Sequence, residues 1–268
     1  MAFHRMAAII LRQYYLTRSS VSRVLSLFIW VIVDIVLWGF ISRYFNTFSS
    51  SGLNLVPVLL GAVLLWDFFV RVMQGVTMAF FEDVWSRNFM NFFTTPLEVS
   101  EYIGGLVLSS ILTSVIGLAV MLALASIAFG LNWFALGFMC MPFLLILFLF
   151  GIALGVLGCA IVLRFGPAAE CYIWSVPAFI APFAGVFYPL STLPQWLQYV
   201  AHMLPPSYVF EGMRSVIAGG GGFPAVALAT GGALAVIYVY AACWFFTRTY
   251  RMAVRSGLIA RYSAESLG

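Results

Sequence analysis

The stretch EDVWSRNFMNFFTTPLEVSE, residues 82–101, is a short polar and aromatic segment between two long apolar segments, and it carries four of the nine acidic residues. Of the 268 residues, 63% are hydrophobic and only 8% are charged. Soluble domains carry about 25% charged residues. A chain so poor in charge cannot cover a surface that faces water, so we expect a polytopic membrane protein built entirely from α-helices.

The chain contains no lysine, because all 13 basic residues are arginines. A P-loop requires the lysine of G-x-x-x-x-G-K-[S/T] to reach the phosphates, so this chain cannot bind ATP in that way. Schiff-base chemistry is excluded for the same reason. The histidines His4 and His202 stand far apart without a cysteine or carboxylate cluster, and we expect neither a metal site nor a catalytic group.

The apolar segments predict one transmembrane domain over residues 1–268 with six membrane-spanning helices. Residues 3–18 form an amphipathic pattern, which predicts an interfacial helix whose Arg5 and Arg12 meet lipid headgroups. The uncharged segment 102–163 is too long for one span and suits two, with a turn near Gly130. The predicted spans are about 24–42, 56–81, 103–129, 135–163, 171–190 and 224–247.

Residues 191–214, after the fifth span, are too apolar for a free loop and too rich in proline for a straight helix. Irregular backbone at membrane depth is tolerated only where protein or water covers it. We therefore expect short re-entrant helices between spans five and six. Arginines set the orientation, because cytoplasmic loops are enriched in them. With the N-terminus inside, ten arginines are cytoplasmic and two are external, so both termini and residues 82–101 are predicted to be cytoplasmic.

Four residues inside the first two spans are candidates for function: Asp34, Trp66, Asp67 and Arg71. A charged side chain at the bilayer centre costs about 2.5–3.5 kcal/mol on insertion scales, so these charges are expected to avoid lipid. Asp67 and Arg71 have the i,i+4 spacing at which a carboxylate and a guanidinium meet. Two interpretations stay open: a clamp that holds the two spans together, or a lining of the transport path.

Within residues 82–101 the pattern predicts an amphipathic helix at about 83–94 that ends before Pro96. Its aromatic face holds Trp85, Phe89 and Phe92, and its polar face holds Arg87, Asn88 and Asn91. Asp83 and Arg87 have the spacing of an ion pair. From the residues alone, an interfacial helix that caps two spans is the simpler interpretation.

Three segments resemble the ABC type-2 permease family, the membrane subunits of ATP-driven exporters. The first is LLGAVLLWDFF at 59–69, and the second is 82–105 with Thr95-Pro96-Leu97 and Glu101-x-x-x-Gly105. The third and most specific segment runs from 184 to 214, with GVFYPL, LPQWL, LPP and Glu211-x-x-Arg214. The family usually has Asn and a single proline where this chain has Leu204-Pro205-Pro206.

This resemblance implies a homodimer of permeases in a bacterial inner membrane, working with two ATPase subunits that bind ATP and Mg. It implies that the helix at 83–94 is a coupling helix that carries ATPase motion into the spans. Arg164–Glu170 would form a second cytoplasmic contact. At the outer mouth, Glu211 and Arg214 lie three residues apart and either stabilise the re-entrant turn or form an exit gate. The full set of candidate residues for the outer gate and re-entrant region is Phe187, Tyr188, Pro189, Trp196, Glu211 and Arg214.

The substrate that the third segment suggests is amphipathic or lipid-like: a drug, a lipid or a lipo-oligosaccharide. Export of a polysaccharide by the same architecture is an alternative. Two other classes, a polytopic membrane enzyme and an ATP-independent transporter, would act without an ATPase partner. The enzyme would require facing acid–base or nucleophile sets, and the transporter would predict internal repeats, which the sequence lacks.

Overall fold

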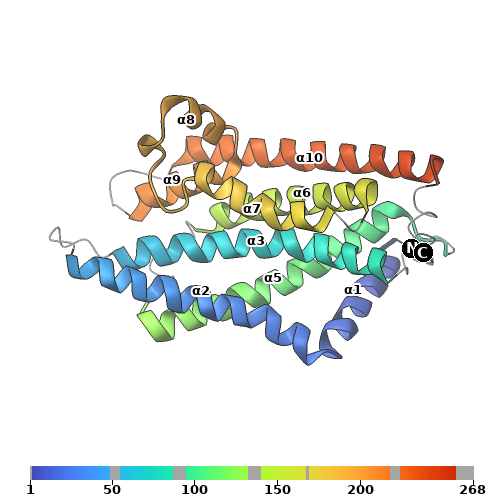
Figure 1. Ribbon diagram of the computed structural model, residues 1–268, viewed down its shortest axis with the longest axis horizontal. Coiled ribbons are helices and arrows are strands. Elements are labelled where there is room, and N and C mark those ends of the chain that lie inside the picture. Colours follow the sequence, from blue (N-terminus) through green and yellow to red (C-terminus); the bar gives the residue numbers. More distant parts are fainter. Residues whose placement is uncertain are drawn as a thin grey trace.

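The computed structural model describes residues 2–48, 55–86, 95–131, 140–166, 169–217 and 224–257, and Figure 1 shows their arrangement. Every regular element among these residues is helical. The elements are, in order, α1 (Ala2–Arg18), α2 (Val21–Phe48), α3 (Leu55–Trp85), α5 (Val99–Phe129), α6 (Cys140–Phe165), α7 (Glu170–Ala184), the 3₁₀ turn η3 (Leu190–Thr192), α8 (Gln195–His202), α9 (Pro205–Ile217) and α10 (Ala225–Arg255).

Five of the described helices are long and apolar enough to cross a membrane: α2, α3, α5, α6 and α10. These helices begin and end several residues away from the predicted bounds at most positions. The fifth predicted span, 171–190, corresponds to α7, which has only 15 residues. At ~1.5 Å per residue α7 is about 22 Å long, less than the ~30 Å hydrocarbon core. The expected count of six full spans is therefore not confirmed.

Helix α3 lies at the centre of the bundle, with α2 and α5 on one side and α6, α9 and α10 on the other (Figure 1). Within their apolar windows, 56% of α3 and 61% of α6 are buried, against 22% of α2 and 17% of α10. The outer helices therefore present most of their apolar surface to lipid or to another subunit.

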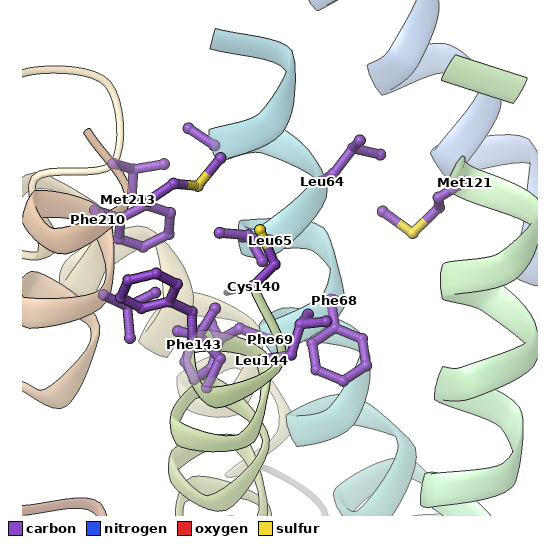
Figure 2. Packing of buried hydrophobic residues seen from close by; sticks show 14 of the residues in the cluster. Leu64, Leu65, Phe68, Phe69, Met121, Cys140, Phe143, Leu144, Phe210 and Met213 are labelled. Carbon is purple, nitrogen blue, oxygen red and sulfur yellow. The ribbon is translucent and has the colours of Figure 1, made fainter. Parts of the chain in front are cut away.

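The core near the α8 end is built where α3, α6 and α9 meet. Figure 2 shows Leu65 and Phe69 of α3 beside Phe143 of α6 and Phe210 of α9, while Met121 of α5 approaches α3 from the other side. A second buried cluster, which includes Phe80, Tyr102 and Phe246, fills the other half of the bundle. Two separate apolar clusters thus fix the register of α3 along its whole length.

The glycines of α6 allow it to approach α3 closely, as the Gly151-x-x-x-Gly155 spacing predicts. A Cβ at Gly155 would lie 2.9 Å from the carbonyl oxygen of Met73, and one at Gly158 would lie 2.8 Å from Oγ1 of Thr77. Thr77 donates a hydrogen bond to the carbonyl of Gly155 at 3.1 Å. The contact is a packing interface, and the thiol of Cys159 on α6 also lies within it, 3.9 Å from the carbonyl of Val76.

The bundle has two distinct ends, which we name by an exposed tryptophan at each. The Trp85 end holds the end of α3, the start of α5, the end of α6 and the end of α10. The Trp196 end holds α8, α9 and the end of α2 (Figure 1). Helix α1 leans against α5 near the Trp85 end, where Ile9 packs against Gly105. Phe3 and Tyr14 on its other face are exposed, and a position of α1 in the membrane interface stays a prediction.

Candidate functional site

A stripe of polar side chains runs along one face of α3 toward the Trp85 end. The stripe has four members, which follow one another at spacings of four, three and eight residues: Asp67, Arg71, Gln74 and Glu82. Residues at these spacings share one face of a helix. From Asp67 to Glu82 the stripe is about 22 Å long at ~1.5 Å per residue. A polar face of this length on the central helix requires covering by other polar groups, by water or by a ligand.

This stripe lines a cavity of about 620 Å³ that opens between α2, α3 and α5. Hydroxyl groups of α5 face the stripe, while α2 and α7 contribute tryptophans. The described residues around it are Gln13, Thr17, Trp30, Val31, Asp34, Asp67, Val70, Arg71, Gln74, Gly75, Met78, Ala79, Glu82, Ser109, Ser110, Thr113 and Trp174. The cavity therefore has polar walls on α3 and α5 and an aromatic, apolar rim.

The structure brings three of the four predicted intramembrane residues to this cavity. Asp34 of α2 and Asp67 and Arg71 of α3 all line it. The aliphatic and guanidinium atoms of Arg71 lie across Gly117 of α5, where a Cβ would come within 2.7 Å of Nε. Trp66 is directed elsewhere, because its ring lies 6.3 Å from that of Phe210 on α9.

The cavity lining includes buried polar atoms for which the described residues provide no hydrogen-bond partner. They include Oδ2 of Asp67 and Nε2 of Gln13. Leaving a polar group buried and unpaired costs about 1–3 kcal/mol, more when it is charged. Such atoms are rare in folded proteins, and in a cavity wall they mark positions where a bound molecule can complete the hydrogen bonding.

A second constellation, at the Trp85 end, fastens α1 to α3 and α5. Both Nη atoms of Arg12 contact the carboxylate of Asp83, the Nη1–Oδ2 distance being 3.0 Å. The hydroxyl of Tyr102 donates to the same carboxylate at 2.6 Å. Arg5 donates to Glu101 at 3.0 Å, and Glu101 also accepts from the backbone N–H of Glu98. We call Arg12, Asp83 and Tyr102 the α1 clasp.

Burial alone would lower the pKa of Arg12, but its hydrogen bonds and attraction to Asp83 outweigh that effect and raise the pKa above its ordinary value. The guanidinium therefore stays charged. The side chain of Asp83 is only 1% exposed. Arg5 and Arg12 are thus engaged by protein carboxylates while staying partly exposed, and contact between them and lipid headgroups stays a prediction.

The predicted coupling residues are only partly described. Trp85 ends α3, is 64% exposed and lies 5.3 Å from the ring of Phe81. Arg164 is exposed in the last turn of α6, beside Phe165, and Glu170 begins α7. Five of the predicted coupling residues lie outside the described part of the chain: Arg87, Asn88, Phe89, Asn91 and Phe92. Asp83 belongs to the last turn of α3, where it pairs with Arg12, so the pairing predicted with Arg87 stays a prediction.

At the Trp196 end, Arg214 of α9 holds the chain that follows α7. Its guanidinium donates to the carbonyl of Gly185, with Nη1 at 2.9 Å, and to that of Tyr188, with Nη2 at 2.9 Å. Glu211 accepts a hydrogen bond from the N–H of Leu190 at 2.7 Å. Gly185 has a φ of +63° and caps α7, whose last residue, Ala184, lies six residues before the predicted end of the fifth span.

The remaining predicted residues of this end surround the same turn. The ring of Phe187 stacks on Trp38 of α2 at 4.5 Å, and the hydroxyl of Tyr188 donates to the carbonyl of Pro182. Pro189 precedes η3, and Trp196 of α8 is 67% exposed. Together these contacts form one folded unit, which we call the Arg214 latch: Gly185–Leu190 with Glu211 and Arg214.

Sequence reasoning missed the α1 clasp and the hydroxyl face of α5. One signal was present, because Arg5 and Arg12 lie two helical turns apart and so share a face of α1, as a pair of anchoring residues would. The hydroxyl groups of Ser109, Ser110 and Thr113 also form a short polar patch within an uncharged span. Neither signal names the partner residue.

The sequence was compared with known proteins and families. It matches the family described as ABC-2 type transporter over residues 9–218, which is well over half of the chain and includes the cavity and the latch. No curated protein matches it. These residues and the bundle of long apolar helices establish the chain as a membrane protein and a permease subunit: it belongs to the ABC-2 type transporter family.

Proposed function

We propose that this permease moves an amphipathic or lipid-like substrate out of the cell, with the Trp85 end in the cytoplasm and the Trp196 end outside. Two copies of the chain would work with two ATPase subunits in a bacterial inner membrane. The observation that carries the proposal is the cavity, which extends from Asp34 and Asp67 toward Glu82 at the Trp85 end. A polar wall with an aromatic rim suits a molecule that has one polar and one apolar part.

The arginine distribution supports this orientation. Within the described helices, Arg5, Arg12 and Arg164 lie near the Trp85 end, and α10 ends there with three more, Arg248, Arg251 and Arg255. Arg43 and Arg214 belong to the Trp196 end. The excess of arginine at the Trp85 end is typical of a cytoplasmic side.

The α1 clasp supports a coupling role for residues 87–94. These residues connect Ser86, which follows Asp83, to the segment that leads into Glu101 and Tyr102. The clasp and the Arg5–Glu101 pair therefore bind α1 to both sides of the connection. A force applied to the connection would be passed to α1, α3 and α5 together, and α3 and α5 carry the polar walls of the cavity.

The proposal is tested with the permease and its ATPase reconstituted in liposomes. Arg87→Ala and Phe89→Ala are expected to reduce co-purification of the ATPase and to abolish substrate-stimulated ATP hydrolysis, because they remove the polar and aromatic contacts of the coupling helix. Candidate substrates are lipids, glycolipids and amphipathic drugs. The control variant is Ser100→Ala. Ser100 is exposed and lies in the first turn of α5, after residues 87–94.

Intact complexes with undiminished coupled hydrolysis in both variants would exclude the coupling role. Export is measured separately, as ATP-dependent uptake into inside-out vesicles. Uptake of long polysaccharides in place of amphipaths would assign the alternative substrate class, and transport that continues without an ATPase would reject the ATP-driven mechanism.

A further inference from the structure

The cavity lining contains more carboxyl groups than basic groups. Among the described residues around it, the carboxylates of Asp34, Asp67 and Glu82 outnumber the single guanidinium of Arg71. The residues facing them from α5 are hydroxyls, Ser109, Ser110 and Thr113, which add no charge. A partly enclosed space with low-dielectric walls strengthens the field of such charges, so a cation is attracted and an anion is repelled.

Asp67 marks the position where a positive group would bind. The residue lines the cavity, its Oδ2 is buried, and no described residue donates a hydrogen bond to that atom. A carboxylate accepts hydrogen bonds only, so the missing partner must be a donor or a cation. A charged nitrogen would both supply the donor and lower the cost of holding a carboxylate at membrane depth.

Apolar side chains that line the same cavity suit the apolar part of the same molecule. Trp30 of α2 is 70% exposed and Trp174 of α7 is 48% exposed, and both line the cavity. Aromatic faces attract cations and cover apolar surface. Val31, Val70 and Met78 continue this apolar lining. One binding space therefore combines carboxylates with aromatic and aliphatic surfaces.

We propose that this cavity binds a cationic amphipath, with the positive group beside Asp67 and Asp34 and the apolar part against Trp30 and Trp174. The inference rests on the proposed export function, because it names the chemical class of the molecule that the permease carries. It also assigns Asp34 and Asp67 to the binding of substrate. A clamp between α2 and α3 would require neither an unpartnered Oδ2 nor the tryptophan rim.

The test uses two probes of nearly equal shape and opposite charge, tetraphenylphosphonium and tetraphenylborate. Binding to the purified full-length permease in nanodiscs is measured by equilibrium dialysis, with empty nanodiscs subtracted. We expect the phosphonium to bind and Asp67→Asn to weaken it by about tenfold, which corresponds to about 1.4 kcal/mol. Asp34→Asn should weaken it as well, and binding of the borate should stay unchanged or increase.

Glu98→Gln is the matched control, since it removes one carboxylate that is exposed and does not line the cavity. Asp34→Asn, on a different helix, keeps the test informative if Asp67→Asn fails to fold. Equal phosphonium affinity in wild type and both variants would overturn the proposal, and so would stronger binding of the borate that depends on Arg71. The binding assay contains no ATPase, whereas the export assay described above requires one. A negative binding result would therefore reject the cationic amphipath as ligand without deciding whether the permease exports another substrate.

Discussion

Replacing Asp83 by asparagine is expected to destabilise the permease by about 3 kcal/mol, because it breaks a buried ion pair. The carboxylate is buried and accepts from both Arg12 and Tyr102. Its loss leaves the guanidinium of Arg12, 26% exposed, without its counter-charge. The midpoint of thermal unfolding in detergent measures the change, and proteolysis after Arg18 should show that α1 has detached.

Two companion variants separate the ion pair from its surroundings. Tyr102→Phe removes one hydrogen bond and should cost about 1 kcal/mol. Arg12→Met combined with Asp83→Leu removes both charges, and a buried pair replaced by apolar side chains of similar size is often neutral or stabilising. The combined variant should therefore be more stable than Asp83→Asn. Wild-type stability of Asp83→Asn would show that the clasp does not hold α1.

Arg214→Ala is expected to open the turn between α7 and η3, at a local cost of about 3 kcal/mol. Hydrogen bonds from a charged donor contribute about 1.5–3 kcal/mol each. The substitution removes such bonds from the carbonyls of both Gly185 and Tyr188. Amide hydrogen exchange should then accelerate in residues 185–193, while exchange in α3 stays slow.

Arg43→Ala is the matched control at the same end of the bundle. Arg43 is exposed, donates to the carbonyl of Ala128 at 3.2 Å and lies 5.0 Å from the ring of Phe129. Exposed interactions of this kind contribute less than about 1 kcal/mol. Arg214→Lys should restore only part of the protection, because an ammonium lacks the planar fork that reaches two carbonyls. Unchanged exchange in Arg214→Ala would show that the latch does not hold the turn.

The class of the protein and most of its helices could be predicted from the sequence, because length and absence of charge define apolar spans without any tertiary information. The end of α7 could not be predicted. Its apolar pattern continues to Leu190, but Gly185 turns the chain and Arg214, 29 residues later, holds that turn. A contact over that distance leaves no periodic pattern in the sequence.

The sequence alone could predict which residues belong to the candidate site, but it could not predict how they are arranged in space. Asp34, Asp67 and Arg71 are conspicuous because they are charged residues within apolar spans. That they line one cavity depends on the rotation of α2 against α3, which packing decides. Asp83 shows the opposite case, since helical spacing suggests Arg87 as its partner, whereas its described partner Arg12 lies 71 residues away.

The most direct test of the central claim, that the Trp85 end engages the ATPase, is photo-crosslinking from two matched positions. Trp85 and Trp196 are exposed to 64% and 67% and lie at opposite ends of the bundle. Each is replaced in turn by p-benzoylphenylalanine, and crosslinked products from membranes are identified by mass spectrometry. We predict that position 85 crosslinks to a subunit containing a P-loop and that position 196 does not; a P-loop subunit captured from position 196, or none from position 85, would contradict the account.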